Sequence, residues 1–430
     1  MKRIIRSIAG LALAAIMAQT GWSIELVSKD DATLNMHGRL QTFGFTNYVE
    51  DPFRDHLRLY LFVKQARLAF NGHVNDIKYD VELAFGGEEG LQTTSGGTAN
   101  ASQGLLDFNM DVPLFGTAYL KTGQFKVPYG LERLTNSGSL LFAERSIMTA
   151  PFNAGRDVGV ALYDNADRYA YTLGIFTGAG RDNPIRDIPL TLGAPLITAR
   201  AGIKNRIDDD LFDPKQVSLE PMKPGFAVFA NALYIKDSRV GHSTVLQVKP
   251  VEKSLLTNSN WNPFITQKDV TGGSNYLLGD LWQAGGDAVY RVNAGPGLLS
   301  VEGEANYGLY KNSAGNVQAT GARIQFGYHQ SPWSVALRYA IVFPDDKSGN
   351  GTVKIFKNRD PIHEVTPSIT MFHKKNLKII FDAPIQVDVP VSVENKLGYY
   401  VLTDQPDQSG VGTVIRQVVP SGRMLLQLVF

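Results

Sequence analysis

Hydrophobic and polar residues alternate along many stretches of the chain. The clearest stretch covers residues 77–85, where every second residue is apolar and the positions between them include Lys78, Asp80 and Glu82. The same period of two recurs over residues 299–309 and 333–339. Because a period of two sends successive side chains to opposite faces of a strand, these segments predict β-strands with one apolar and one polar face.

The connections between the expected strands alternate in length as well. Short turns are expected at 75–76, 113–116, 164–168, 293–296, 330–332 and 373–376. Longer connections are expected at 48–61, 88–103, 128–155, 179–193, 236–279, 311–318, 344–361 and 389–419. One rim of short turns, facing the periplasm, and one rim of long loops, facing outward, are typical of an outer-membrane β-barrel.

Counting hairpins in this way predicts an all-β fold, a transmembrane antiparallel β-barrel of about 16 strands. The first strand is expected near residues 32–48 and the last at 421–430. The link at 207–224 is long where a short one is expected, and we interpret it as an enlarged periplasmic turn. A barrel of this size leaves an aqueous lumen, whereas one of ~8 strands is filled by its own side chains.

Both ends of the chain carry export features. Lys2, Arg3 and Arg6 precede an apolar run at 8–18, which predicts a signal peptide over residues 1–23 that is cleaved after Ala18 or Ser23. This run is shorter than the ~20 residues that a membrane-spanning helix needs. The barrel would then occupy residues 24–430, in the bacterial outer membrane and in contact with its lipid.

Composition excludes several classes of function. The formal net charge is +1 and the chain has no cysteine, so nucleic acid is not an expected partner, and disulfides and cysteine-bound metal centres are excluded. The seven histidines show no metal-ligand spacing, so neither a metal nor a cofactor is expected. No serine elbow flanked by glycines is present, and we predict no enzyme activity, although an outer-membrane hydrolase remains a rival interpretation.

Three motifs lie in the first part of the chain: GQFKVPYG at 123–130, AERS at 143–146 and RDVGV at 156–160. With QARL at 65–68 and LGIFTG at 173–178, they resemble the phosphate-selective porin O and P family. The resemblance covers roughly residues 62–180. It implies a 16-stranded, trimeric barrel whose third long loop, here 128–155, folds inward and narrows the pore. The terminal Phe430 resembles the assembly signal of outer-membrane barrels.

The candidate pore-lining residues come from this loop and from the polar faces of the strands. They are Lys126, Arg133, Glu144, Arg145, Arg156, Arg67, Lys78, Arg323 and Arg338. Guanidinium and ammonium groups in a narrow passage suit anions. Lys126 is expected to point inward because Phe125 and Val127 are expected to face lipid. For Glu144 and Arg145 the alternative is that they pair with the barrel wall and hold the loop in place.

The expected function is a porin, a water-filled channel for passive diffusion of small hydrophilic solutes. The inward-facing wall is expected to carry both signs of charge, because Asp80, Glu82 and Glu304 are expected to face inward together with the basic residues, so anion preference should be mild at most. The rival roles are a barrel that sheathes a partner such as an electron-transfer cytochrome, and a surface adhesin. The adhesin would use the long loop at 236–279, which carries Trp261, Phe264 and Tyr276.

Overall fold

The structure of the chain is a computed structural model. It describes residues 24–49, 56–87, 91–93, 99–101, 104–149, 151–178, 180, 195–207, 210–219, 221–239, 278–312, 315–345, 349–350, 353–354, 361–374, 376–392 and 414–430. The expected signal peptide and most of the loop at 236–279 lie outside these residues.

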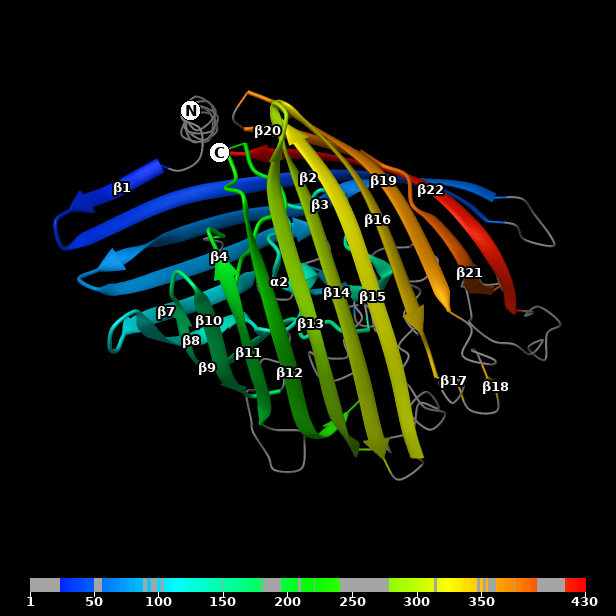
Figure 1. Cartoon of the computed structure of the whole chain (residues 1–430), viewed down its shortest axis with the longest axis horizontal. Helices are drawn as coiled ribbons and strands as arrows, with labels where there is room; N and C mark the ends of the chain where they lie inside the picture. Colours follow the sequence, from blue (N-terminus) through cyan, green and yellow to red (C-terminus); the bar gives the residue numbers. More distant parts are fainter. Residues whose placement is uncertain are drawn as a thin grey trace.

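Almost all of the described chain is β-strand (Figure 1). The strands are β1 Ile24–Lys29, β2 Ala32–Val49, β3 His56–Val74, β4 Ile77–Gly87, β5 Leu91–Thr93, β6 Ala99–Ala101, β7 Leu105–Pro113, β8 Ala118–Lys126, β9 Arg156–Asn165, β10 Tyr169–Phe176, β11 Leu196–Asn205, β12 Gly225–Arg239, β13 Leu278–Ala294, β14 Gly297–Asn312, β15 Gly315–Gln330, β16 Trp333–Phe343, β17 Gly349–Asn350, β18 Val353–Lys354, β19 Ile362–His373, β20 Leu377–Asp382, β21 Ile385–Ser392 and β22 Val414–Val429. A short helix, α2 Leu131–Leu134, and a 3₁₀ turn, Ile147–Thr149, lie between β8 and β9.

The main sheet closes into a 16-stranded antiparallel barrel, as the alternation predicts. The sheet contains 18 strand segments, but β20 and β21 share one position between β19 and β22. In the same way β1 pairs with the first part of β2, and β22 pairs with the rest of β2. The seam closes at the chain end, where the Phe430 N–H donates to Gly38 O at 3.0 Å and the Gly38 N–H donates to Phe430 O at 2.5 Å.

Some boundaries differ from the sequence-based expectation. The hairpin partner β1 was not predicted, since its residues 24–29 precede the expected first strand. The last strand begins at Val414 rather than at 421, so the loop before it is shorter than expected. The link expected at 311–318 is also shorter, because β14 continues to Asn312 and β15 begins at Gly315. The boundaries were predicted from the alternation of apolar and polar residues, and these strands extend beyond the stretch that alternates.

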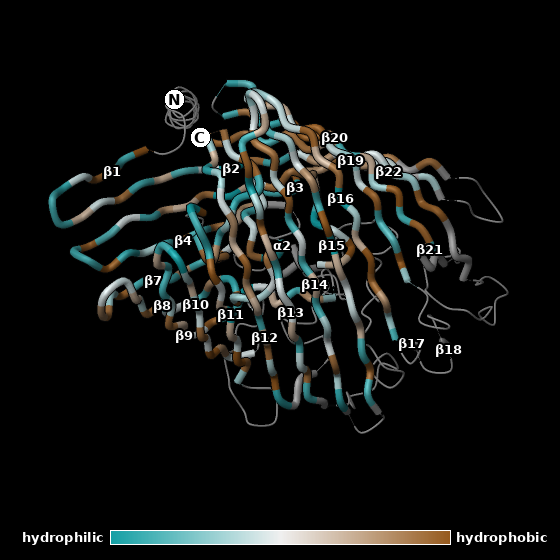
Figure 2. The backbone as a smooth tube through the Cα atoms, in the orientation of Figure 1, coloured by the Kyte–Doolittle hydropathy of each residue, from teal (hydrophilic) through white to brown (hydrophobic). Residues whose placement is uncertain are grey.

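The two faces of the barrel wall have opposite polarity, and Figure 2 shows the alternation along β12 to β16. Large apolar side chains are exposed on the outside, for example Leu57, Leu59 and Leu61 on β3 at 71–78% exposure. Charged side chains such as Arg291, Asp287 and Glu302 are buried inside, on the opposite face of their strands. An exposed apolar outer band is stable against lipid tails rather than water. Among the described residues no helix is long and apolar enough to cross a membrane.

Two connecting segments pack against the inner face of the barrel. The first, residues 128–155, begins and ends at one point, where the Val127 N–H donates to Gly155 O at 3.1 Å. We call it the inner loop. The second, residues 206–224 between β11 and β12, starts from the rim of short turns, and we call it the inner turn. Apolar residues of both segments, among them Leu131, Met148, Phe152 and Phe212, join the main buried cluster with inward residues of the wall.

Candidate functional site

The inner loop is anchored to the far wall by one buried carboxylate. Glu132, in α2, accepts a hydrogen bond from Arg338 of β16 at 3.0 Å and one from the Ser146 hydroxyl at 2.5 Å, and it also accepts from Thr149. The Arg323 guanidinium of β15 lies 3.6 Å away. Arg338 is 0% exposed and divides its charge between Glu132 and Glu364 of β19. The α2 end of the loop is therefore fixed by an ion network.

A second set of contacts holds the distal part of the inner loop. Glu144 pairs with Lys64 of β3, and the Ala143 N–H donates to Asp382 of β20 at 2.8 Å. Lys378 of β20 donates to the carbonyl oxygen of Gly138 at 2.5 Å. Together the two sets of contacts tie the loop to strands on both sides of the barrel.

The inner turn is attached to the inner loop rather than to the rim. Asp213 accepts from Lys126, at the end of β8, and from the Asn136 amide. The Asn136 N–H donates to Pro214 O at 3.0 Å, and the Val217 N–H donates to Ser139 O at 3.0 Å. Sequence analysis placed this turn on the correct rim, but it did not predict that the turn folds inward.

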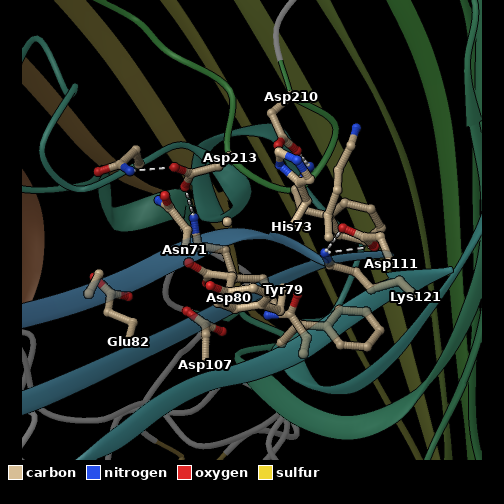
Figure 3. A pocket seen from close by; sticks show the side chains of 18 of the residues that line it. Asn71, His73, Tyr79, Asp80, Glu82, Asp107, Asp111, Lys121, Asp210 and Asp213 are labelled. Carbon is tan, nitrogen blue, oxygen red and sulfur yellow. Dashed lines mark hydrogen bonds and ion pairs between the residues drawn. The ribbon is translucent and has the colours of Figure 1, made fainter. Parts of the chain in front are cut away.

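A polar cavity of about 860 Å³ remains between these segments and strands β2, β3, β4, β7 and β8 (Figure 3). Its ion pairs include Arg67–Glu82 at 3.0 Å and Arg156–Asp107 at 2.8 Å. Glu82 is shared, since Arg156 also lies 3.3 Å from it. A smaller cavity of about 450 Å³, under β2, β20 and β22, shares part of the same lining.

The structure separates the candidate pore-lining residues into two groups. Six of them line the larger cavity: Arg67, Lys78, Lys126, Arg133, Arg145 and Arg156. The other three, Glu144, Arg323 and Arg338, are buried at contacts between the inner loop and the wall. Glu144 thus pairs with the barrel wall, as the alternative interpretation expected. Arg145 instead donates to carbonyl oxygens of its own loop, Glu132 O and Thr135 O.

Lys126 does line the cavity, but the prediction that Phe125 and Val127 face lipid is wrong. Phe125 does not face lipid: it is 2% exposed and contacts Phe212 of the inner turn, with ring centroids 5.6 Å apart. Val127 is likewise buried. Phe125 lies on the same face of β8 as Lys121, which also lines the cavity, because the two positions are four residues apart and β8 pairs continuously with β7 and β9. Lys126 is the last residue of β8, where the chain leaves the strand for the inner loop.

Sequence reasoning missed Lys64, Asp107, Asn136 and Asp213. Asp107 was detectable, because residues 107, 109 and 111 form a polar alternation of their own in the segment that became β7. Asp213 and Asn136 lie in irregular segments, where a periodic pattern carries no information about direction. Among the described residues no group of three or more acidic or histidine side chains could hold a metal ion.

The two anchoring carboxyls, Glu132 and Glu144, have lowered pKa values. Burial acts to raise the pKa of Glu132, but Arg323 and Arg338 outweigh it and lower that pKa to about 2. Burial likewise acts against ionisation of Glu144, and Lys64 and Arg145 lower its pKa to about 2. Both carboxylates are therefore charged in the folded protein at any pH from neutral down to mild acidity.

These lowered pKa values predict how the docking of the inner loop depends on pH. A carboxyl whose pKa is depressed by folding contributes stability above its unfolded pKa of ~4.3, and this stability is lost as pH falls toward the folded value. Single-channel current should be steady from pH 7 to 5 and become noisier between about pH 4 and 2. Glu132→Gln has no charge at this position at any pH, so its current should already be noisy at pH 7 and should change less on acidification. An unchanged profile in that variant would exclude Glu132 as a cause.

The sequence of the chain was compared with protein families and with curated proteins. Residues 35–187 match the model of the phosphate-selective porin O and P family, which confirms the resemblance seen in the motifs. A search of curated proteins found no match.

Several solved porins and outer-membrane proteins are similar to the chain at low sequence identity. An anion-selective porin from Comamonas acidovorans is 11% identical, with a TM-score of 0.56 over 93% of this chain and 100% of that chain. OmpT of Vibrio cholerae in its trimer form is 11% identical, with a TM-score of 0.51 over 93% of this chain and 100% of that chain. OmpF of Salmonella typhi in complex with daunomycin is 12% identical, with a TM-score of 0.51 over 95% of this chain and 100% of that chain. At these identities the likeness establishes the fold.

Proposed function

We propose that the chain forms a water-filled channel in the bacterial outer membrane for passive diffusion of small hydrophilic solutes. The observation that carries this proposal is the polar cavity of about 860 Å³ inside a closed barrel whose outer face is apolar. Lipid outside and water inside are the two environments that such a wall requires. The match of residues 35–187 to a porin family supports the same function.

The charges of the cavity support at most a mild preference for anions. Its lining contains seven basic residues, Arg67, Lys78, Lys121, Lys126, Arg133, Arg145 and Arg156, and seven acidic residues, Asp76, Asp80, Glu82, Asp107, Asp111, Asp210 and Asp213. Strong selectivity needs a ring of one sign. Here several of the charges neutralise one another, as in the pair of Lys121 with Asp111 at 3.0 Å.

Reversal potentials in asymmetric potassium chloride test this proposal. The purified protein in planar bilayers should conduct ohmically, with a reversal potential close to zero. Lys126→Ala and Arg156→Ala should each shift it modestly toward cation preference, because each removes one of several lining cations. Asn205→Ala, an exposed position on β11, is the matched control and should leave it unchanged. Strong anion selectivity that either variant abolishes would contradict the mixed-wall argument.

The assembly is proposed to be a homotrimer, supported by the trimer form of the similar V. cholerae barrel. Among the rivals, a sheath around a partner protein is disfavoured because the inner loop and inner turn occupy the space that a partner would need. The adhesin role depends on residues 240–277, which lie outside the described chain. Nothing in the geometry of the described residues favours a hydrolase.

A further inference from the structure

A row of four polar side chains crosses the wall of the larger cavity at one level. Asn35 of β2 is paired in register with Asn71 of β3, Asn71 with Asp80 of β4, and Asp80 with Asn109 of β7. The next partner, Gly123 of β8, has no side chain and ends the row. All four side chains line the cavity, and Figure 3 shows Asn71 and Asp80 directed into it. We call them the asparagine row.

The side chains of the asparagine row are unpaired, unlike those on either side of it. Toward the short-turn rim, Thr33 bonds His73 at 2.8 Å, and Lys121 donates to Asp111 at 3.0 Å. In the other direction Arg67 and Arg156 hold Glu82 and Asp107. Within the described part of the chain, no side chain of the row makes a hydrogen bond or an ion pair with another residue.

The lack of a partner is most significant for Asn109, the buried member of the row, whereas the other three side chains are half-buried. Asn109 is only 7% exposed, and its Oδ1 has no hydrogen-bond partner. Buried polar groups in folded proteins are nearly always satisfied, and exceptions call for a ligand, water or a functional role. An unpaired row between two paired rows therefore has its full hydrogen-bonding capacity available to whatever occupies the cavity.

We propose that the asparagine row is a binding site for neutral polyhydroxylated solutes, namely sugars and short oligosaccharides. The inference rests on the proposed channel function and names the class of solute that this channel favours. Each asparagine amide offers both donors and acceptors, and the Asp80 carboxylate accepts from hydroxyl groups. A hydroxyl is both donor and acceptor, so a chain of hydroxyls complements such a row along its length.

The geometry favours a neutral solute over an ion. The row has one formal charge among three amides, and the other acids of the same wall, Glu82, Asp107 and Asp111, already have basic partners. With strands ~4.8 Å apart, four neighbouring strands give a row of ~14 Å, which is longer than one sugar ring. Phe125 and Phe212 also border the cavity, but they are 2% and 8% exposed and pack in the main buried cluster, so recognition rests on the polar row.

Sugar binding can be measured with and without channel activity. Trehalose or maltotriose, added to the reconstituted protein in potassium chloride, should interrupt the ion current in a saturable way. Asn71→Ala and Asn109→Ala should each raise the sugar concentration for half-maximal block about fivefold, the effect expected for one lost hydrogen bond. Asp80→Ala should raise this concentration further, and the Asn205→Ala control should leave it unchanged. Calorimetric titration of the detergent-solubilised protein with the same sugars should rank the variants identically.

The outcomes separate this inference from the proposed function. Steady conductance without sugar block or calorimetric binding would overturn the saccharide site and leave the channel standing. Binding in calorimetry without any conductance would support the site and overturn the channel. Block by putrescine rather than by sugars, abolished in Asp80→Asn, would identify the row as a cation site and refute the proposal.

Discussion

Replacing Glu132 with alanine is expected to release the inner loop from the far wall and to destabilise the folded barrel by about 3–5 kcal/mol. The reason is what the substitution leaves behind. Arg338 and Arg323 are almost completely buried and face Glu132 from two neighbouring strands. Arg338 keeps Glu364 and Arg323 keeps Glu304 as ion partners, but the buried donors of Arg338, Ser146 and Thr149 lose the acceptor that Glu132 provides. Buried donors without an acceptor are far more costly than the loss of a surface pair.

Two measurements test the expected effect of Glu132→Ala. Urea unfolding monitored by tryptophan fluorescence should report the loss of stability, and single-channel recording should show larger and noisier conductance because the loop no longer keeps one position. Glu25→Ala is a suitable control, since Glu25 is exposed on β1 and its removal should change stability by less than about 0.5 kcal/mol. If Glu132→Ala unfolds and conducts like the unsubstituted protein, the Glu132 network does not hold the loop.

The barrel could be predicted from the sequence because its signal is periodic. Every strand that spans lipid must expose one apolar and one polar face, so the alternation at 77–85 reports both the strand and its orientation. The barrel seam and the strand boundaries were harder to predict from the sequence. The strand β1 has no apolar face of its own, and five of its six residues are exposed in the structure, so periodicity gave it no weight.

The site was predictable only where it lies on regular strands. Arg67 and Arg156 were found by alternation and motif, and both line the cavity. The sequence does not distinguish residues that line the cavity from residues that anchor the inner loop, because Arg67 and Arg338 lie in the same alternating pattern. What separates them is which wall the inner loop covers, and this depends on the contacts of Glu132 with β15 and β16. Such contacts join residues about 200 positions apart, and no local rule predicts them.

Replacement of residues 207–224, which are all of the inner turn except its first residue, by Asn-Gly is expected to open the lumen from the rim of short turns. In the structure Asn205 pairs with Phe226, so a short hairpin connection can close β11 to β12 without disturbing the register. The replacement removes Asp213 from Lys126 and Asn136, and removes the backbone contacts of the turn with the inner loop. It also removes Phe212 and Asp210 from the cavity lining.

Conductance should rise several-fold in this variant, and the reversal potential should shift toward anion preference, because the cavity loses two carboxylates, Asp210 and Asp213, while Lys126 loses its partner. Asp213→Asn separates the two effects. Its side chain is 38% exposed, the most accessible acid among the ion pairs of the cavity, so neutralising it should shift selectivity while leaving conductance nearly unchanged. A larger pore without a change in selectivity would mean that the acids of the inner turn do not act on the passing ions. If neither quantity changes, the inner turn lies outside the conduction path, and the lumen is controlled by the inner loop alone.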